Sequence, residues 1–285
     1  MAMEPLDLSH RPLLHPLLKT AGVTLSEFSF ANLFLFRRRH NYRVSVEGTA
    51  PFITGETYDG LRFAMPAGDL RRLPAHMMEE MLAAADALFP IPQEWLTLFD
   101  SERFVWTCQD GDADYIYPTE QICTFQGRKM HAKKNLRNQF VAQHRHQGRP
   151  LTIERIPDAL AILDSWQTDS GLPHQDTDYA ACREALQLSE ELQLCGGIYY
   201  AEDLPAGFIL GEELGQEMFV LHFAKALIRF KGIYQFLFSS FACILPGHYR
   251  RLNLEQDLGQ EGLRASKQSY APEFLQKKYR VSRRR

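Results

Sequence analysis

Alternating and helical patterns of apolar residues divide the chain into two successive sets of elements. In the second set, strand-like runs follow one another at residues 197–200, 206–212 and 218–224, with tight turns between them. A helical pattern at 178–194 precedes these strands and an apolar helix at 233–245 follows them. A period of two residues indicates strands and a period of 3.6 indicates helices. The order predicts a mixed sheet that is covered by helices.

The first set repeats this order more loosely. A helix is predicted over 24–38, where Thr24 or Ser26 can cap its first turn. The turn residues at 59–60 predict a hairpin. Further helices are predicted at 74–89 and 127–146. The second set begins with a strand predicted at 151–156 and a helix predicted at 157–167.

The length of 285 residues allows one large domain or two modest ones. We divide the chain into an N-terminal arm at 1–22, a first half at 23–147 and a second half at 148–285. The hydrophobic fraction of 45% and charged fraction of 24% are ordinary for a soluble globular protein.

Cysteine usage and the missing targeting signals predict where in the cell the protein is located. The five cysteines are scattered and form no C-x-x-C pair, which argues against disulfides and favours reducing conditions. The start of the chain lacks a signal peptide, and no apolar run is long enough for a transmembrane segment. A cytoplasmic location is therefore predicted.

A basic segment is the clearest charge feature. Residues 125–150 carry seven Lys or Arg, three His and no acidic residue. On a helix, Lys129, Lys133 and Arg137 would share one face, and Arg128 and Lys134 would widen the patch. Such a surface suits a tRNA or other polyanion, or an anionic lipid surface. An ordinary solvated helix face is the alternative.

A basic turn precedes the apolar helix at 233–245. It contains Arg229, Lys231, Gly232 and Ile233. A strand that enters a helix through such a turn directs free amide groups towards a phosphate. The alternative is that Gly232 only starts the helix.

Two acidic residues follow in Asn253–Gly259. If this segment is a strand, Glu255 and Asp257 lie on one face and can supply a general base. They can equally pair with Arg250, Arg251, Arg264 or Lys267 in a structural network.

Three further residues complete the candidate site. Lys267 and Tyr270 share a helix face, and we predict that Lys267 helps to bind the donor. Alternation places His222 and Lys225 on opposite faces of their strand, so that His222 can face the carboxylates or be a buried core histidine. No metal-ligand spacing is present, and no metal is predicted.

At these positions the chain resembles bacterial proteins that share the C-terminal domain of phosphatidylglycerol lysyltransferase. The resemblance implies an α/β fold of mixed sheets, with two tandem GNAT acyltransferase-like domains as in Fem-type peptidyltransferases. It also implies that Tyr270 is the general acid and that the turn at Gly232 holds the donor. Tyr234 departs from the small residue that acyl-CoA enzymes carry there. The resemblance rests on Asp114–Tyr117, Gly127–Phe140, His222–Lys225, Lys231–Tyr234 and Asn253–Pro272.

Three functions follow as hypotheses. The first is a transferase that moves an acyl or aminoacyl group from an activated donor, by resemblance an aminoacyl-tRNA, to an amine or hydroxyl on a lipid or small molecule. The second is N-acetylation with acyl-CoA as the donor. The third is a non-catalytic protein that binds RNA or another anion on a degenerate GNAT scaffold.

Overall fold

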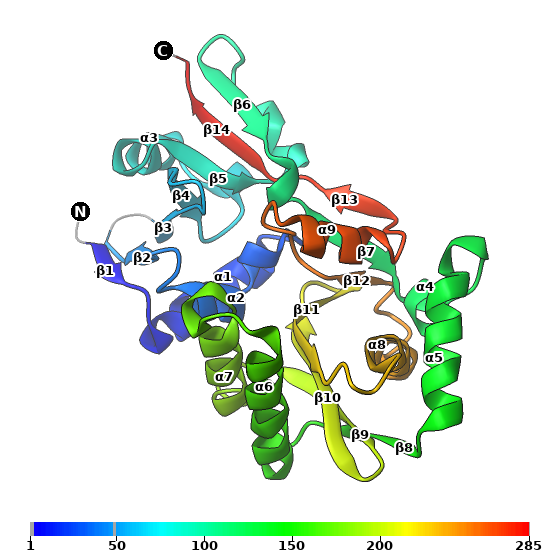
Figure 1. The fold of residues 1–285 in the computed structure, drawn as a ribbon. Helices are drawn as coiled ribbons and strands as arrows, with labels where there is room; N and C mark the ends of the chain where they lie inside the picture. Colours follow the sequence, from blue (N-terminus) through cyan, green and yellow to red (C-terminus); the bar gives the residue numbers. More distant parts are fainter. Residues whose placement is uncertain (1–2, 48–49, 285) are drawn as a thin grey trace. The chain divides into compact units, whose positions relative to one another are not determined.

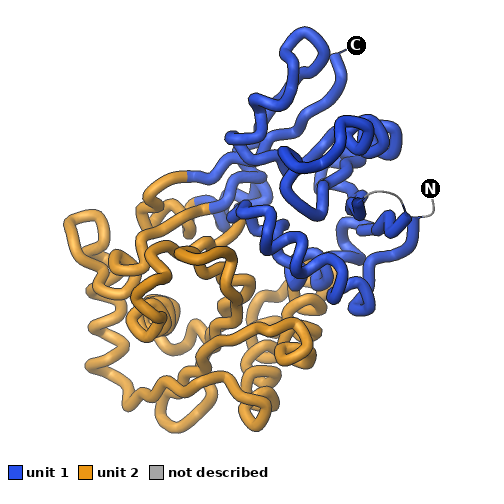
Figure 2. The backbone as a smooth tube through the Cα atoms, turned by 180° about the vertical axis from the view of Figure 1, so that it is seen from behind, with its two compact units in different colours: residues 1–114, 256–264, 275–285 blue, residues 115–255, 265–274 orange. Residues whose placement is uncertain are grey.

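The chain folds into two compact units. The computed structural model describes residues 3–47 and 50–284. Unit 1 combines Met1–Asp114 with Gln256–Arg264 and Leu275–Arg285, and unit 2 combines Tyr115–Glu255 with Ala265–Phe274 (Figure 2). The chain thus leaves unit 1, builds most of unit 2 and returns. The sequence boundaries at residues 22 and 147 stay a prediction.

Unit 1 is built on a mixed sheet with the strand order β1-β2-β3-β4-β5-β14-β6. Among the described strands of this sheet, only β4 and β5 run parallel to each other, and α3 connects them. Trp95, Phe52 and Phe63 are fully buried in its core. The strands are β1 (Met3–Pro5), β2 (Arg43–Ser45), β3 (Phe52–Glu56), β4 (Arg62–Pro66), β5 (Ala87–Ile91), β6 (Phe104–Cys108) and β14 (Tyr279–Arg283). The helices are α1 (Arg11–Thr20), α2 (Phe30–Phe36) and α3 (Ala75–Ala84).

Unit 2 carries the second sheet, in the order β13-β7-β12-β11-β10-β9-β8. Strands β11 and β12 are parallel and are connected through α8. Helix α6 packs on β10 and β11 from one side and α8 from the other (Figure 1). The strands are β7 (Asp114–Pro118), β8 (His146–Pro150), β9 (Cys195–Ala201), β10 (Leu204–Glu213), β11 (Met218–Ala226), β12 (Arg251–Asn253) and β13 (Phe274–Gln276). The helices are α4 (Thr119–Thr124), α5 (His131–Gln143), α6 (Ile156–Ser170), α7 (Tyr179–Gln187), α8 (Ile233–Ile244) and α9 (Glu261–Gln268).

The α/β class with mixed sheets is confirmed. Each unit contains a strand–helix–strand crossover between parallel neighbours, β4–α3–β5 in unit 1 and β11–α8–β12 in unit 2. The same local unit therefore occurs twice in the chain.

Two predicted elements differ from the structure for identifiable reasons. The helix predicted from residue 24 starts at Phe30, because the Ser29 side chain accepts the Asn32 amide and caps it. Ser26 instead bonds to Asp114. The strand predicted at 151–156 is wrong, because α6 begins at Ile156 behind a short 3-10 turn. The preceding strand β8 is exposed throughout, so no apolar alternation marks it.

Candidate functional site

A β-bulge in β11 positions His222. Leu210 of β10 lies opposite Phe223 and Gly211 lies opposite Leu221, so His222 is an extra residue without a cross-strand partner. A bulge re-aims the side chain that it contains and shifts the alternation beyond it. The simple alternation that separated His222 from Lys225 therefore does not apply along this strand.

The re-aimed His222 ring lies between two glutamates. Its Nε2 is 3.0 Å from Glu212 Oε1, and its Nδ1 is 2.8 Å from Glu255 Oε1. The His222 side chain is fully buried, and both carboxylates are largely buried. Burial lowers the pKa of His222, but the hydrogen bonds and charges of Glu212 and Glu255 outweigh this effect and raise the pKa to about 10. At neutral pH the ring is therefore an imidazolium that donates to both carboxylates.

This pKa predicts a pH profile of stability. The proton is bound more tightly in the folded chain than in the unfolded chain, where the pKa of histidine is about 6.5. The stability that the charged ring contributes should be complete below pH 6.5 and should decline as pH rises through about 10. We expect the difference in unfolding free energy between the wild type and His222→Gln, measured with urea, to shrink across this range. A constant difference from pH 6 to pH 10 would contradict the assignment.

Glu255 reaches His222 because β12 stops short. Asn253 ends the strand, and its side-chain oxygen accepts the Glu255 amide at 2.7 Å. Glu255 then adopts a left-handed backbone conformation with φ 57°. Lys267 fixes this turn, since its Nζ donates to the backbone oxygens of Leu254 at 2.7 Å and of Glu255 at 3.2 Å. The predicted donor-binding ammonium thus holds the backbone that carries Glu255.

Asp257 does not share the surroundings of Glu255. It belongs to unit 1, is fully buried, and accepts hydrogen bonds from Arg264 at 2.8 and 3.2 Å. A second contact to the Gly259 amide, at 2.8 Å, closes the turn before α9. The expected common strand face for the two acids is absent, and the contacts of Asp257 are those of a turn-stabilising residue.

Tyr270 is buried beside the basic helix. Its hydroxyl accepts a hydrogen bond from Gln235 at 2.9 Å, and Lys133 Nζ lies 4.1 Å from the centre of its ring. Burial raises the pKa of the Tyr270 hydroxyl. It also lowers the pKa of Lys133. Tyr270 therefore keeps its proton at neutral pH, as a general acid must.

The turn before α8 shows why residue 232 is glycine. Its φ is 87°, and a Cβ atom there would lie 2.1 Å from the Leu136 carbonyl oxygen of α5. The buried Ile233 donates its amide to Phe230 at 3.0 Å. Arg229 and Lys231 are exposed on either side of the turn. Close packing of α5 on α8 accounts for Gly232, whereas its role at a phosphate stays a prediction.

The predicted basic residues lie in two environments. Arg128 and Lys129 precede α5 in a short 3-10 turn, so the helix predicted over 127–146 is shorter than expected. Arg128, Lys129 and Lys134 are exposed. Lys133 covers Tyr270, and Arg137 donates to Ser239 Oγ at 3.1 Å and to the Cys123 carbonyl at 3.4 Å. Among residues 3–47 and 50–284, no carboxylate forms an ion pair with any of these five cations. The helix therefore presents positive charge that the described residues do not neutralise.

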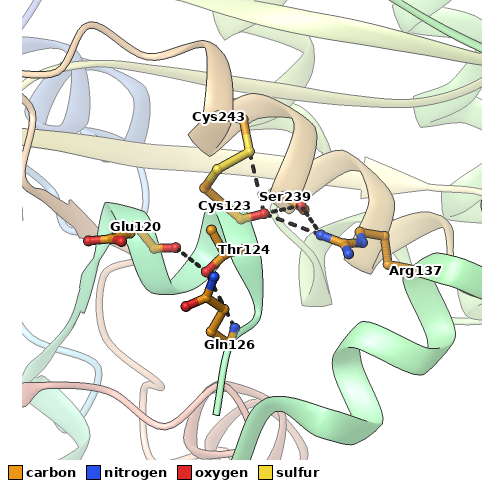
Figure 3. The surroundings of a disulfide bond; sticks show 7 residues. All are labelled: Glu120, Cys123, Thr124, Gln126, Arg137, Ser239 and Cys243. Carbon is orange, nitrogen blue, oxygen red and sulfur yellow. Dashed lines mark hydrogen bonds between the residues drawn. A yellow bond between two sulfur atoms is a disulfide. The ribbon is translucent and has the colours of Figure 1, made fainter.

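The prediction that the cysteines form no disulfide is wrong. Cys123 of α4 and Cys243 of α8 are bonded, although 120 residues separate them in sequence (Figure 3). The Cys123 carbonyl also accepts a hydrogen bond from Ser239, so that α4, α5 and α8 meet at this point. Sequence spacing could not reveal the pair, because only the packing of α4 on α8 brings the two sulfurs together.

The contacts of two residues could not be predicted from the sequence, although Lys225 itself was named beside His222. Glu212 joins the site only through the bulge. Lys225 is buried, bonds to Asp178 at 2.6 Å, and lies 3.6 Å from the centre of the Trp166 ring.

Within the described part of the chain, no group of three or more His, Cys, Asp or Glu side chains could hold a metal ion. None of the helices described is both long and apolar enough to cross a bilayer.

Comparison with solved structures defines the class of protein. The fold is that of tandem GNAT acyltransferase-like proteins: FemX superposes with a TM-score of 0.50, covering 99% of this chain and 97% of FemX at 10% identity. The chain belongs to the family described as phosphatidylglycerol lysyltransferase, C-terminal, whose model matches residues 20–282. The resemblance seen in the sequence is thereby confirmed.

Individual relatives differ in how closely they match. A conserved protein of unknown function from Bacteroides thetaiotaomicron has a TM-score of 0.86 and 25% identity, with full coverage of both chains. L-PGS from Bacillus licheniformis has a TM-score of 0.56 and 16% identity over 85% of this chain and 84% of that chain. An uncharacterized protein of Mycoplasmoides gallisepticum is 26% identical over 69% of this chain, and the match spans 63% of that relative's length.

Proposed function

We propose that the chain is an aminoacyltransferase. The donor is an amino acid esterified to tRNA, and the acceptor is an amine or hydroxyl on a lipid or small molecule. The observation that carries the proposal is the contact between Glu255 and His222, at the point where β11 and β12 part. Family membership supports the reaction class, since the family is named for lysyl transfer to phosphatidylglycerol. A tRNA-borne donor also accords with the predicted cytoplasmic location.

The protonation state of His222 decides whether His222 or Glu255 can act as the base. Because this ring keeps its proton up to about pH 10, it cannot act as a base at neutral pH. The acceptor proton passes to Glu255, which His222 positions. The acceptor nitrogen or oxygen attacks the ester carbonyl carbon, and the bond from that carbon to the ribose oxygen breaks. Tyr270, whose hydroxyl stays protonated, returns a proton to the leaving oxygen. Asp257 takes no step in this scheme.

Helix α5 and the Gly232 turn provide a surface for the tRNA. Gly232 packs against Leu136 of α5, so the exposed Arg229 and Lys231 adjoin the helix that carries Lys134 and that follows the turn with Arg128 and Lys129. Phosphate contacts from Lys and Arg supply affinity without reading sequence and weaken with salt. These cations therefore suit the donor's backbone, and an anionic lipid surface is the competing ligand of the same charge.

Transfer from charged tRNA tests the proposal. Wild-type protein should move radiolabelled amino acids from a mixture of aminoacyl-tRNAs to an acceptor in a bacterial lipid or small-molecule extract. Glu255→Gln should lower kcat about 100-fold, because the carboxylate that takes the proton is lost. Lys134→Glu should instead raise KM for the tRNA and reduce the salt dependence of binding.

Glu190→Gln is the matched control, since Glu190 is an exposed glutamate and should leave transfer unchanged. Loss of label from tRNA into water alone, or equal rates for Glu255→Gln and the wild type, would count against the enzyme. Salt-sensitive tRNA binding without transfer would favour the non-catalytic alternative.

A further inference from the structure

The edge of β11 that faces β12 is only partly covered. The two strands pair from Met218 opposite Arg251 to Val220 opposite Asn253. Strand β11 continues to Ala226, six residues beyond the last pair in the described part of the chain. An uncovered strand edge can accept an extended ligand through main-chain hydrogen bonds. This edge is therefore the natural place for an amide-bearing donor arm to add.

At the end of this edge, near Ala226, a side chain of the protein itself already occupies the main-chain hydrogen-bonding position. The Leu227 amide donates to Ala206 of β10 at 2.9 Å, which makes that pair the hydrogen-bonded one in the antiparallel ladder. The neighbouring pair, Gly207 with Ala226, consequently directs its main-chain groups outward. The outward Ala226 amide donates to the hydroxyl of Tyr234 at 3.3 Å.

The position of the Tyr234 side chain depends on residues of α6 and α7, which lie on the other face of the sheet. Tyr234 lies in the first turn of α8, where burial raises the pKa of its hydroxyl, and the side chain of Trp166 in α6 is near enough to lower this pKa in part. Trp166 in turn lies against Lys225, whose Nζ is bonded to Asp178 at the start of α7. Groups from α6, α7, α8 and β11 thus fix the tyrosine across the end of the strand.

We propose that Tyr234 determines donor specificity by closing this edge to extended donors of the acyl-CoA type. The inference rests on the proposed acyl-transfer function and narrows its donor. The pantetheine arm of CoA carries two amides and adds along an open edge, whereas a tRNA-borne amino acid ester presents a compact group. The sequence suggested that Tyr234 crowds the phosphate turn. The structure instead places its hydroxyl on the amide that the arm would need.

Binding of free CoA tests this role without any transfer assay. By isothermal titration calorimetry, Tyr234→Ala should bind CoA at least about tenfold more tightly than the wild type, because the amide and the space beside it are released. Tyr234→Phe separates the two effects: it frees the Ala226 amide but keeps the ring, so its CoA affinity should lie between those of the wild type and Tyr234→Ala. Equal CoA affinity of the wild type and Tyr234→Ala would overturn the proposal.

Hydrogen exchange keeps the proposal testable if Tyr234→Ala does not fold. In Tyr234→Phe the Ala226 amide loses its acceptor, and its exchange should be about tenfold faster than in the wild type. Unchanged exchange at Ala226 would show that the hydroxyl does not occupy the edge. A gain of CoA binding in a chain that never transfers from tRNA would uphold the role of Tyr234 and refute the proposed function. Transfer from tRNA by the wild type, together with unchanged CoA binding in Tyr234→Ala, would support the proposed function and refute the role of Tyr234.

Discussion

Replacing Lys278 by methionine should lower the unfolding free energy by about 3–5 kcal/mol, because it removes one partner of a buried ion cluster. The ammonium is fully buried in unit 1 and lies 2.8 Å from Glu27 Oε1 and 2.7 Å from Asp114 Oδ1. Ser26 and Gln256 complete its hydrogen bonds. Without the cation, two carboxylates would stay buried beside each other.

Urea denaturation at neutral pH measures this loss, and Lys277→Met is the matched control because Lys277 is exposed. The loss should shrink at lower pH. Burial raises the pKa of Glu27 to about 7 against the attraction of Lys278, so acid neutralises one of the two carboxylates in the folded chain. A loss below about 1 kcal/mol for Lys278→Met, within the range of a surface ion pair, would contradict the cluster's role.

Removing the bond between Cys123 and Cys243 should cost about 2–4 kcal/mol under oxidising conditions. The bond closes a long loop, with a sequence separation of 120 residues, and so restricts the unfolded chain. Cys243→Ser should therefore unfold at lower urea concentration than the wild type.

Cys108→Ser is the control, because Cys108 is an exposed free thiol. Dithiothreitol should bring the wild type down to the stability of Cys243→Ser and leave that variant unchanged. A wild-type midpoint that does not respond to dithiothreitol would mean that the bond does not form in solution.

The parts of the fold that sequence predicted well are those with strong apolar patterns. Strands β9, β10 and β11 are marked by largely apolar runs because most of their residues are buried, and α8 is marked by its apolar run after a glycine. Strand β8 was misplaced because it is exposed at an edge, where side-chain burial imposes no pattern. Helix α2 begins late because a capping bond decides its start, and Ser26, Thr24 and Ser29 are equally good candidates in sequence.

The site was predicted less completely, for a different physical reason. The sequence left open whether His222 faces the carboxylates, because its contact with Glu255 depends on a bulge and a left-handed residue. Both features break the alternation from which side-chain directions were predicted. Glu212 enters through the same bulge, and Asp257 separates from Glu255 at the same break in the strand. Sequence periodicity describes regular strands, and this site is built where two strands become irregular.

The place of β14 in unit 1 has a consequence for synthesis. This strand follows all the other elements in chain order, yet it lies between β5 and β6 in the interior of its sheet. On the ribosome, β5 and β6 must therefore wait until residues 279–283 have emerged, whereas strands β8 to β12 become available earlier. Released chains truncated before residue 279 should have a protease-resistant unit 2 and a unit 1 that is still open to cleavage. A chaperone that binds unpaired strand edges would meet its substrate in this interval.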